Sequence, residues 1–365
     1  MLNFKLKSNM NFLIILASVI IVFSCIYFFI SNNESFYDKT IAKITTVEDT
    51  LSNMQDSTGK IEQIKAQKIK AVIMNGSQKG KEIELQNKTS FSQTNNLDLK
   101  VNDEVFVDLP SSKIIDFKRD KYIGYITILF VLLILFIGGY KGFRSLCSVI
   151  INICIFLILV KLFLNGFNFT IASIAASILF IILSIAIVCG INRKAFSAIV
   201  STMVCTVIAL FISFLAIKLN NWNGIHFEEM EFLLRSPETI FLVEILIGTL
   251  GAIMDIAISI SSYINERYDI NPNIETSELI KSGMELGRDI MGTMTNTLLF
   301  AYISGSIPLI LLLLKNNYSI YYIISNNLSL ELIRAITGSI GVVLCIPISI
   351  YISVFSMKNN KIGEV

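Results

Sequence analysis

An aspartate lies in the middle of an apolar segment that is long enough to cross a membrane. Asp255 stands within Ile240–Ile264, where most other residues are aliphatic or small. A charged side chain at the centre of a membrane helix costs roughly 2.5–3.5 kcal/mol on insertion scales, so such residues are rare and usually functional. Asp255 is therefore the first candidate for chemistry, as a site for a cation, a proton or a polar group of a substrate.

The residues around Asp255 form a stripe with helical spacing. Steps of three and four residues connect Glu244, Gly248, Gly251, Asp255, Ser259 and Ser262. At 3.6 residues per turn these positions share one face of a helix. Small residues let a second helix approach closely in lipid, and a carboxylate there needs a partner or water. We therefore expect the stripe to face other helices or a cavity.

The next apolar segment supplies candidate partners for Asp255. One face of Ser282–Ser306 carries Glu285, Asp289, Gly292, Thr293 and Asn296. Consecutive membrane helices run antiparallel, and at 1.5 Å per residue Asp255 and Asn296 lie ~13.5 Å and ~12 Å from the inner surface. The predicted substrate- or ion-binding site consists of Asp255, Asn296, Thr293, Gly251 and Ser259. A charge cluster at the inner interface consists of Glu285, Arg288 and Asp289, with Arg288 paired to Glu285.

Composition places these segments in a polytopic membrane protein. Of the 365 residues, 53% are hydrophobic and 16% are charged, and the mean hydropathy is +0.67. Eight apolar runs approach or reach the length of about 17–25 residues that a membrane helix needs. They are Phe12–Ile30, Ile123–Gly139, Val149–Leu164, Phe169–Val188, Ala195–Leu219, Ile240–Ile264, Asp289–Leu314 and Leu332–Ser356. We predict an α-helical polytopic membrane protein with about eight transmembrane helices, seven of them in a domain at 123–356, followed by a tail at 357–365.

The first run is expected to anchor a separate domain. Phe12–Ile30 follows Lys5 and Lys7 and exceeds the usual signal-peptide core of about 7–15 residues, so we expect 1–30 to be an uncleaved anchor. The polar stretch after it carries 13 Lys and Arg and 14 Asp and Glu between residues 31 and 120. The stretches "IAKITTV", "KIKAVIM", "KEIELQN" and "LDLKVNDEVFVDL" show alternation or β-branched runs, with turns at Asn75-Gly76 and Asn102-Asp103. We predict a small extracytoplasmic β-rich domain at 31–122, OB-like or a β-barrel, with a mobile polar segment near 50–60.

Basic residues predict the orientation of the helices. With the N-terminus inside, eleven Lys and Arg fall on the cytoplasmic side and five on the short outer loops and helix ends. Lysine and arginine favour the cytoplasmic side of membrane proteins. Both termini are therefore expected in the cytoplasm and residues 31–122 outside.

Other kinds of site find little support in the sequence. The single histidine, His226, excludes a multi-histidine metal site, and no two cysteines have metal-ligand spacing, so we expect no metal and no cofactor. A net charge of +2 without a basic patch gives no indication of nucleic-acid binding. Motifs of the His-Glu-x-x-His and Gly-x-Ser-x-Gly types are absent, and Asp289 is too far from Asp255 for a catalytic dyad, so we expect no enzyme.

Three stretches resemble the YibE/F-like family of bacterial membrane proteins. They are "NGSQKGKEIELQN" at 75–87, "GTLGAIMDIAISISS" at 248–262 and "GMELGRDIMGTMTNTLLFAYISG" at 283–305. With the helix spacing, the likeness extends from about residue 70 to 355. The resemblance implies a multi-pass protein of the bacterial cell membrane, draws attention to Asp255, Arg288, Asp289 and Asn296, and supplies no substrate.

The intramembrane carboxylate favours a transporter or channel for an ion or small solute, with Asp255 as its binding group. The alternative is a non-transporting scaffold or envelope-assembly factor that acts through the outer β-domain. In that case the stripe only joins helices. The expected partners are the lipid bilayer and a membrane partner that is either a second copy or a paralogous chain.

The charge bias makes a testable prediction about topology. Single cysteines placed at positions 90 and 226 of a cysteine-free chain should react with an impermeant reagent in sealed cells. Cysteines at positions 193 and 275 should react only after the membrane is opened. Reaction at position 275 in sealed cells would reverse the predicted orientation of the segment between the two site helices.

Overall fold

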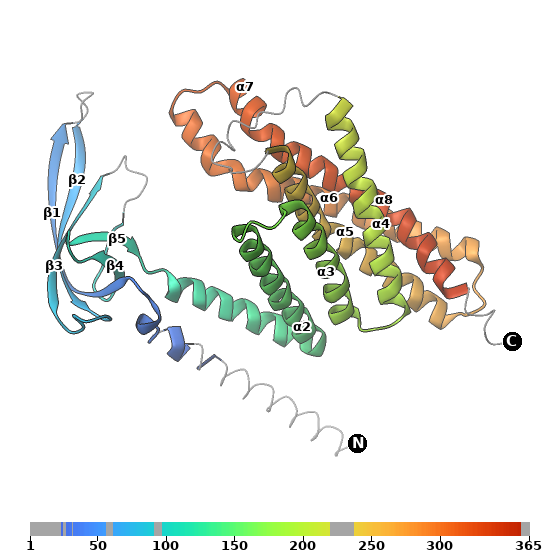
Figure 1. Cartoon of the computed structure of the whole chain (residues 1–365), viewed down its shortest axis with the longest axis horizontal. Coiled ribbons are helices and arrows are strands. Elements are labelled where there is room, and N and C mark those ends of the chain that lie inside the picture. The colour runs from blue at the N-terminus through green and yellow to red at the C-terminus, as the bar shows by residue number, and fades with distance from the viewer. Residues whose placement is uncertain are drawn as a thin grey trace, which may run out of the picture. The chain divides into compact units, whose positions relative to one another are not determined.

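A computed structural model describes residues 23–24, 27–30, 32–55, 61–90, 97–219 and 237–358. The chain divides into two compact units, Met1–Gly139 and Tyr140–Val365 (Figure 1). Most of the first predicted span, residues 220–236 with His226, and the residues beyond 358 lie outside the described residues. The described parts of the first span, 23–24 and 27–30, are helical.

The first unit contains a five-stranded antiparallel sheet that curves into a half-barrel. A short 3-10 helix, Glu34–Phe36, precedes it. Its strands are β1 (Thr40–Gln55), β2 (Ile61–Ile73), β3 (Glu82–Ser90), β4 (Glu104–Asp108) and β5 (Lys113–Phe117). The strand order is β3-β2-β1-β4-β5, and the two edge strands approach each other. The predicted β-rich domain is therefore present, as a half-barrel of five strands.

Alternating side chains build the core of this sheet. Ile69 of β2 lies opposite Val47 of β1 and Leu85 of β3, and both Ile69 and Leu85 are buried. The buried amide of Asn75 holds the chain where it enters β1. It donates to three backbone carbonyls and accepts a hydrogen bond of 2.7 Å from the N–H of Ile41. The predicted turn at Asn75-Gly76 thus also positions the first strand.

The sheet differs from the expected one in two places. Residues 50–55, expected in a mobile polar segment, belong to β1, which pairs with β2 from Ala42 to Gln55; residues 56–60 lie outside the described part. A cross-strand ion pair, Lys65 of β2 with Asp49 of β1 at 2.8 Å, lies next to this polar stretch. Strand β5 was not expected, since its short sequence carries a charge on either side of Ile114 and Ile115.

Charged side chains are buried where the sheet meets the next helix. The ammonium of Lys118 lies 2.7 Å from Glu104 Oε2, and both side chains are at most 5% exposed. Lys118 also donates to Asn33 Oδ1 at 2.7 Å, and Lys121 contacts the second oxygen of Glu104. Burial alone would raise the pKa of Glu104, but the hydrogen bonds from the two lysines together outweigh it and hold the pKa below its usual range.

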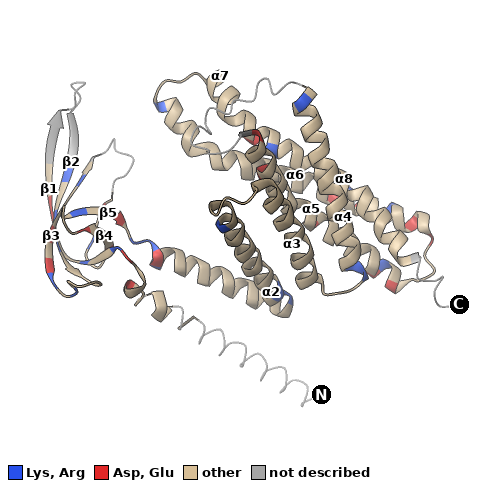
Figure 2. Cartoon of the chain, viewed as in Figure 1, with Lys and Arg blue, Asp and Glu red and all other residues tan. Residues whose placement is uncertain are grey.

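Six helices among the described residues are long and apolar enough to cross a membrane. They are α2 (Asp120–Leu164), α3 (Phe169–Cys189), α4 (Arg193–Leu219), α5 (Pro237–Ile270), α6 (Thr276–Lys315) and α8 (Ser329–Lys358), with the short α7 (Ile320–Ile323) and a π-helical turn, Ile324–Leu328, before α8. Figure 2 shows their lengths largely free of charge, with most acidic and basic residues near helix ends or in the sheet. These features support a membrane protein.

The helix boundaries differ from the predicted ones in two places. The runs 123–139 and 149–164 both fall within α2, which Gly139 interrupts with non-helical angles (φ 53°, ψ −130°). Seven of the eight predicted runs therefore lie in six helical elements. Helix α6 starts at Thr276, well before the predicted run 289–314, and continues to Lys315; the chain before it turns at Asn271, whose Oδ1 accepts from the N–H of Asn273.

Helix α8 packs against α4, α5 and α6 at the centre of the second unit. Glycines allow these close approaches. A Cβ at Gly341 of α8 would lie 2.7 Å from Ile253 of α5, and a Cβ at Gly287 of α6 would overlap Ile346 of α8. Such small-residue contacts drive helix association in lipid, where burial of apolar area gives little advantage.

The buried charges of the first unit make stability depend on pH. Glu104→Gln should destabilise the fragment 31–122 by about 3–5 kcal/mol, because it leaves the buried Lys118 ammonium with only the more distant carboxylate of Asp120, at 3.8 Å. Since the folded-state pKa of Glu104 is lowered, its contribution is present above the unfolded pKa of about 4.3 and is lost as pH falls through the folded pKa. Circular dichroism melts of the wild type between pH 7 and pH 3 should show this loss.

The matched control is Glu84→Gln, which removes an exposed carboxylate from β3. It should melt like the wild type at every pH. A Glu104→Gln variant with an unchanged melting temperature would contradict the role of this ion pair, and an unfolded wild-type fragment would contradict the independence of the domain.

Candidate functional site

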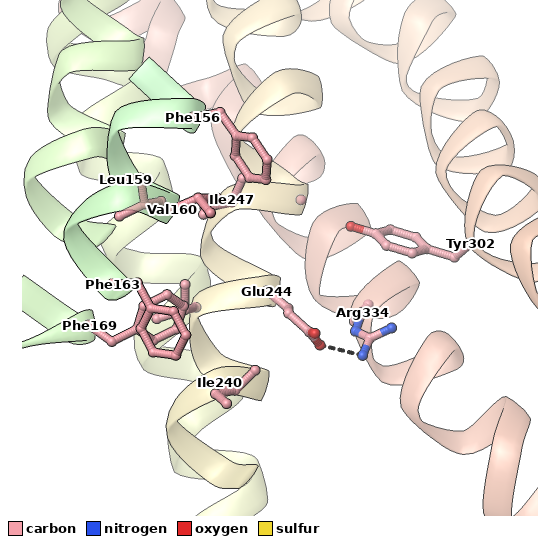
Figure 3. A pocket seen from close by; sticks show the side chains of 12 residues that line it. Phe156, Leu159, Val160, Phe163, Phe169, Ile240, Glu244, Ile247, Tyr302 and Arg334 are labelled. Carbon is pink, nitrogen blue, oxygen red and sulfur yellow. Dashed lines mark hydrogen bonds and ion pairs between the residues drawn. The ribbon is translucent and has the colours of Figure 1, made fainter. Parts of the chain in front are cut away.

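A groove of about 490 Å³ in the second unit combines apolar walls with charged side chains (Figure 3). It is lined by Phe156, Leu159, Val160, Phe163, Phe169, Ile240, Val243, Glu244, Ile247, Gly248, Tyr302 and Arg334. These residues come from α2, α3, α5, α6 and α8. Two smaller grooves, of about 430 Å³ between α6 and α8 and about 340 Å³ beside α3 and α4, have no charged side chain in their walls. The first groove is therefore the candidate site.

Arg334 forms the polar end of the groove by pairing with two carboxylates. Its Nη2 donates to Glu244 Oε2 of α5, and its Nη1 donates to Glu331 Oε1 at 2.6 Å. Glu331 lies one turn before Arg334, so this ion pair forms within α8. The ion pair with Glu244 joins α8 to α5. The Arg334 side chain is 13% exposed, against 41% for Glu244, and its guanidinium also lies 5.4 Å from the ring centre of Phe241.

Two buried polar atoms beside this group have no partner among the described residues. They are Tyr302 Oη and Arg334 Nε. Tyr302 reaches from α6 to Gly248 of α5 so closely that a Cβ at Gly248 would overlap its hydroxyl oxygen. A glycine at this position therefore admits the hydroxyl into the groove. Buried polar groups normally have a hydrogen-bond partner, so these two atoms indicate a place for a polar ligand or water.

The predicted stripe of α5 begins at the groove. Glu244 and Gly248 line it, and Gly251, Asp255 and Ser259 follow on the same exposed face. The opposite face of α5 is buried, with Ile253, Ile256 and Ile260 inaccessible to solvent. Within the described part of the chain, Asp255 takes part in no hydrogen bond or ion pair. The stripe thus leads from a paired carboxylate to an unpaired one, but it faces outward from this chain and not into its core.

Two contacts fix the depth of α6 against α5. Tyr302 meets Gly248, and a Cβ at Gly283 would lie 2.8 Å from Ile264 Cδ1. Because the two helices are antiparallel, Asp255 lies between these contacts, at the depth of the α6 turn that carries its two predicted partners.

Those partners nevertheless project away from α5. Leu298 of α6 lies with Thr249 against Gly338 of α8, and so marks the packed side of α6. At 3.6 residues per turn, Thr293 and Asn296 lie roughly on the opposite side of the helix, and both are exposed. The hydroxyl of Thr293 donates to its own helix, to Ile290 O at 2.9 Å. The structure therefore brings Gly251, Asp255 and Ser259 together, but does not bring Thr293 or Asn296 to them.

The predicted interfacial cluster is also exposed. Glu285, Arg288 and Asp289 all lie on the surface of α6, and no ion pair joins Glu285 to Arg288 in the described structure. At an exposed position such a pair contributes little, so its absence carries no cost for the fold. These residues form a charged surface and not a closed site.

The groove residues Tyr302 and Arg334, and Glu331, which pairs with Arg334, were not singled out by the sequence pattern. Glu331 and Arg334 carry a local signal, because residues three apart on a helix are neighbours and an arginine near a membrane span needs a carboxylate. Tyr302 lies within the stretch 283–305 but has no spacing that marks it. Its role depends on the contact with Gly248, which joins two helices.

Comparisons with known proteins cover both units. The sequence profile described as YibE/F-like protein matches residues 126–359, and the profile of the YibE/F family N-terminal domain matches residues 35–122. Neither a curated protein nor a solved structure shows significant similarity to the chain. The two matches contain the whole sheet, the groove and Asp255. The chain therefore belongs to the YibE/F-like family.

Proposed function

We propose that this protein is a transporter or channel for an ion or small solute, and that its path follows the exposed face of α5. One observation carries the proposal: a single helix face connects the charged groove at Glu244 with the unpaired carboxylate of Asp255. Gly251 lies between them, and a Cβ there would meet open space. A solute that leaves the groove would thus meet small residues first and a carboxylate next.

The unpaired state of Asp255 is the physical reason for this reading. A carboxylate in hydrocarbon must acquire a proton, a cation, water or a donor from another chain, because leaving it charged and bare is costly. The described part of this chain supplies no donor to it. A passing cation or proton fills that need, and a site that is filled only in transit is what transport requires.

The arrangement in the cell follows from the charge bias of the loops. We place the protein in the bacterial cell membrane with both termini in the cytoplasm and the sheet domain, which we take to be OB-like, outside. Glu244 and Arg334 lie near the outer ends of their predicted spans, so the groove would open close to the outer surface. A second copy or a paralogous chain would cover the polar face of α6.

A non-transporting scaffold or envelope-assembly factor is the second candidate. Gly251 of α5 and Gly292 of α6 both leave open space where a Cβ would be, which suits a helix of another chain. In that case Asp255 would bond to a donor of the partner, and the outer sheet domain would make the functional contacts. Neither candidate assigns an enzymatic step to the chain.

Flux through purified protein separates the two candidates. Proteoliposomes should take up at least one member of a panel of monovalent cations, divalent cations and organic cations. Asp255→Asn, which keeps size and hydrogen bonding but removes the charge, should lower that flux by about tenfold or more, since one unit of 1.4 kcal/mol in binding or barrier is a factor of ten. Asp255→Glu should retain part of the flux.

The matched control is Asp269→Asn, the same change on the same helix beyond the predicted span, at an exposed position. It should leave the flux unchanged. Full flux through Asp255→Asn would show that Asp255 is not a binding group for the transported solute. The absence of flux for every solute in the panel would favour the scaffold.

A further inference from the structure

The groove has one aromatic side and one polar side. Phe156 and Phe163 of α2 and Phe169 of α3 line the first, and Glu244 and Tyr302 lie on the second (Figure 3). Its volume of about 490 Å³ lies within the range of about 300–1,000 Å³ that is usual for sites of drug-sized molecules. The walls suit a molecule with a bulky apolar body and one polar centre.

The charges beside the groove do not balance. Two carboxylates, Glu244 and Glu331, share the single guanidinium of Arg334, so the group of three carries one net negative charge when ionised. Arg334 engages only Oε2 of Glu244, and Oε1 has no partner among the described residues. Glu244 lines the groove, and its side chain is the most exposed of the three at 41%. The net charge therefore faces the groove through Glu244.

We propose that this groove binds hydrophobic organic monocations, with Glu244 as the counter-ion and the phenylalanine rings around the apolar body. Aromatic faces attract cations, and the attraction strengthens when the cation has left water. The buried hydroxyl of Tyr302 offers an acceptor oxygen to a cation that carries N–H groups, and Arg334 Nε offers a donor to an ether or carbonyl oxygen of the same ligand.

Two other classes of ligand fit less well. A bare metal ion such as Ca²⁺ takes six to eight oxygen ligands, and the groove wall offers the oxygens of Glu244 and Tyr302 among mainly apolar side chains. An organic anion would meet a guanidinium that two carboxylates already neutralise, and would be repelled by the net negative charge.

The proposal names the class of solute that would bind at the outer end of the proposed path. It rests on the proposed function only for the claim that the bound cation is then transported. Binding itself is measured without transport. Equilibrium dialysis of the purified full-length protein in detergent should show saturable binding of tetraphenylphosphonium at one site per chain. Tetraphenylborate, which has the same shape and the opposite charge, should show only the partitioning found with empty micelles.

Substitutions then locate the site. Glu244→Gln should weaken tetraphenylphosphonium binding by about tenfold or more, as expected when a desolvated counter-ion is lost. Glu278→Gln removes an exposed carboxylate in the first turn of α6, away from the groove, and should bind like the wild type. Saturable binding of tetraphenylborate at equal affinity, or unchanged cation binding by Glu244→Gln, would overturn the proposal.

A second variant covers the case in which Glu244→Gln fails to fold without its partner for Arg334. Phe156→Leu leaves the ion pairs intact and removes one aromatic face, and it should weaken cation binding by about threefold or more. Phe211→Leu, at an exposed position of α4 that does not line the groove, is its control. Equal binding by both phenylalanine variants would place the cation elsewhere. If the wild-type protein does not bind tetraphenylphosphonium but still carries an inorganic-ion flux, the proposed ligand class is wrong and the proposed transport stands. If it binds tetraphenylphosphonium but shows no flux of any solute, the proposed transport is wrong and the ligand class stands.

Discussion

The pairing of Arg334 with Glu244 is the constraint on which the arrangement of the site helices depends. An arginine whose side chain is only 13% exposed in an apolar bundle is costly unless carboxylates satisfy its guanidinium. Glu331 comes from the same helix, so of the two ion pairs only the one with Glu244 joins α8 to α5. With α8 fixed there, α6 packs on it through Gly287, and Tyr302 arrives at Gly248. The groove is the space that remains beside these contacts.

The properties of the fold that depend on neighbours in sequence were predictable. Apolar runs located seven helical segments, because the length and hydropathy of a span are local quantities. The turn at Asn75-Gly76 was also predictable from its residue types. The interruption of α2 at Gly139, with residues 140–148 helical after it, was not predictable, since hydropathy does not show backbone angles. Strand β5 and the polar half of β1 depend on pairing with distant strands, which composition alone does not show.

For the candidate site, the sequence likewise predicted which residues share a helix face, but not which faces meet. Spacing identified Gly251, Asp255 and Ser259 as one face of α5, because residues three and four apart share a face in any helix. The same rule placed Thr293 and Asn296 on one face of α6, but spacing does not say which face a neighbour covers. The contact of Leu298 with Gly338 decides that, and turns both side chains outward. The groove residues Tyr302 and Arg334 become a site only through contacts between helices.

The two carboxylates of α5 are in different physical situations. Glu244 is bound to Arg334, and removing it would leave a guanidinium with one partner fewer, so the fold depends on it. Asp255 has no partner in the described chain, and the helix packs through the opposite face, so the fold does not need its charge. A charge in an apolar segment that folding does not use is a cost to stability. The charge of Asp255 is therefore expected to serve a ligand or a partner outside the folded chain. Substitution of Asp255 can then reduce function without reducing stability, whereas substitution of the ion-paired Glu244 would affect both.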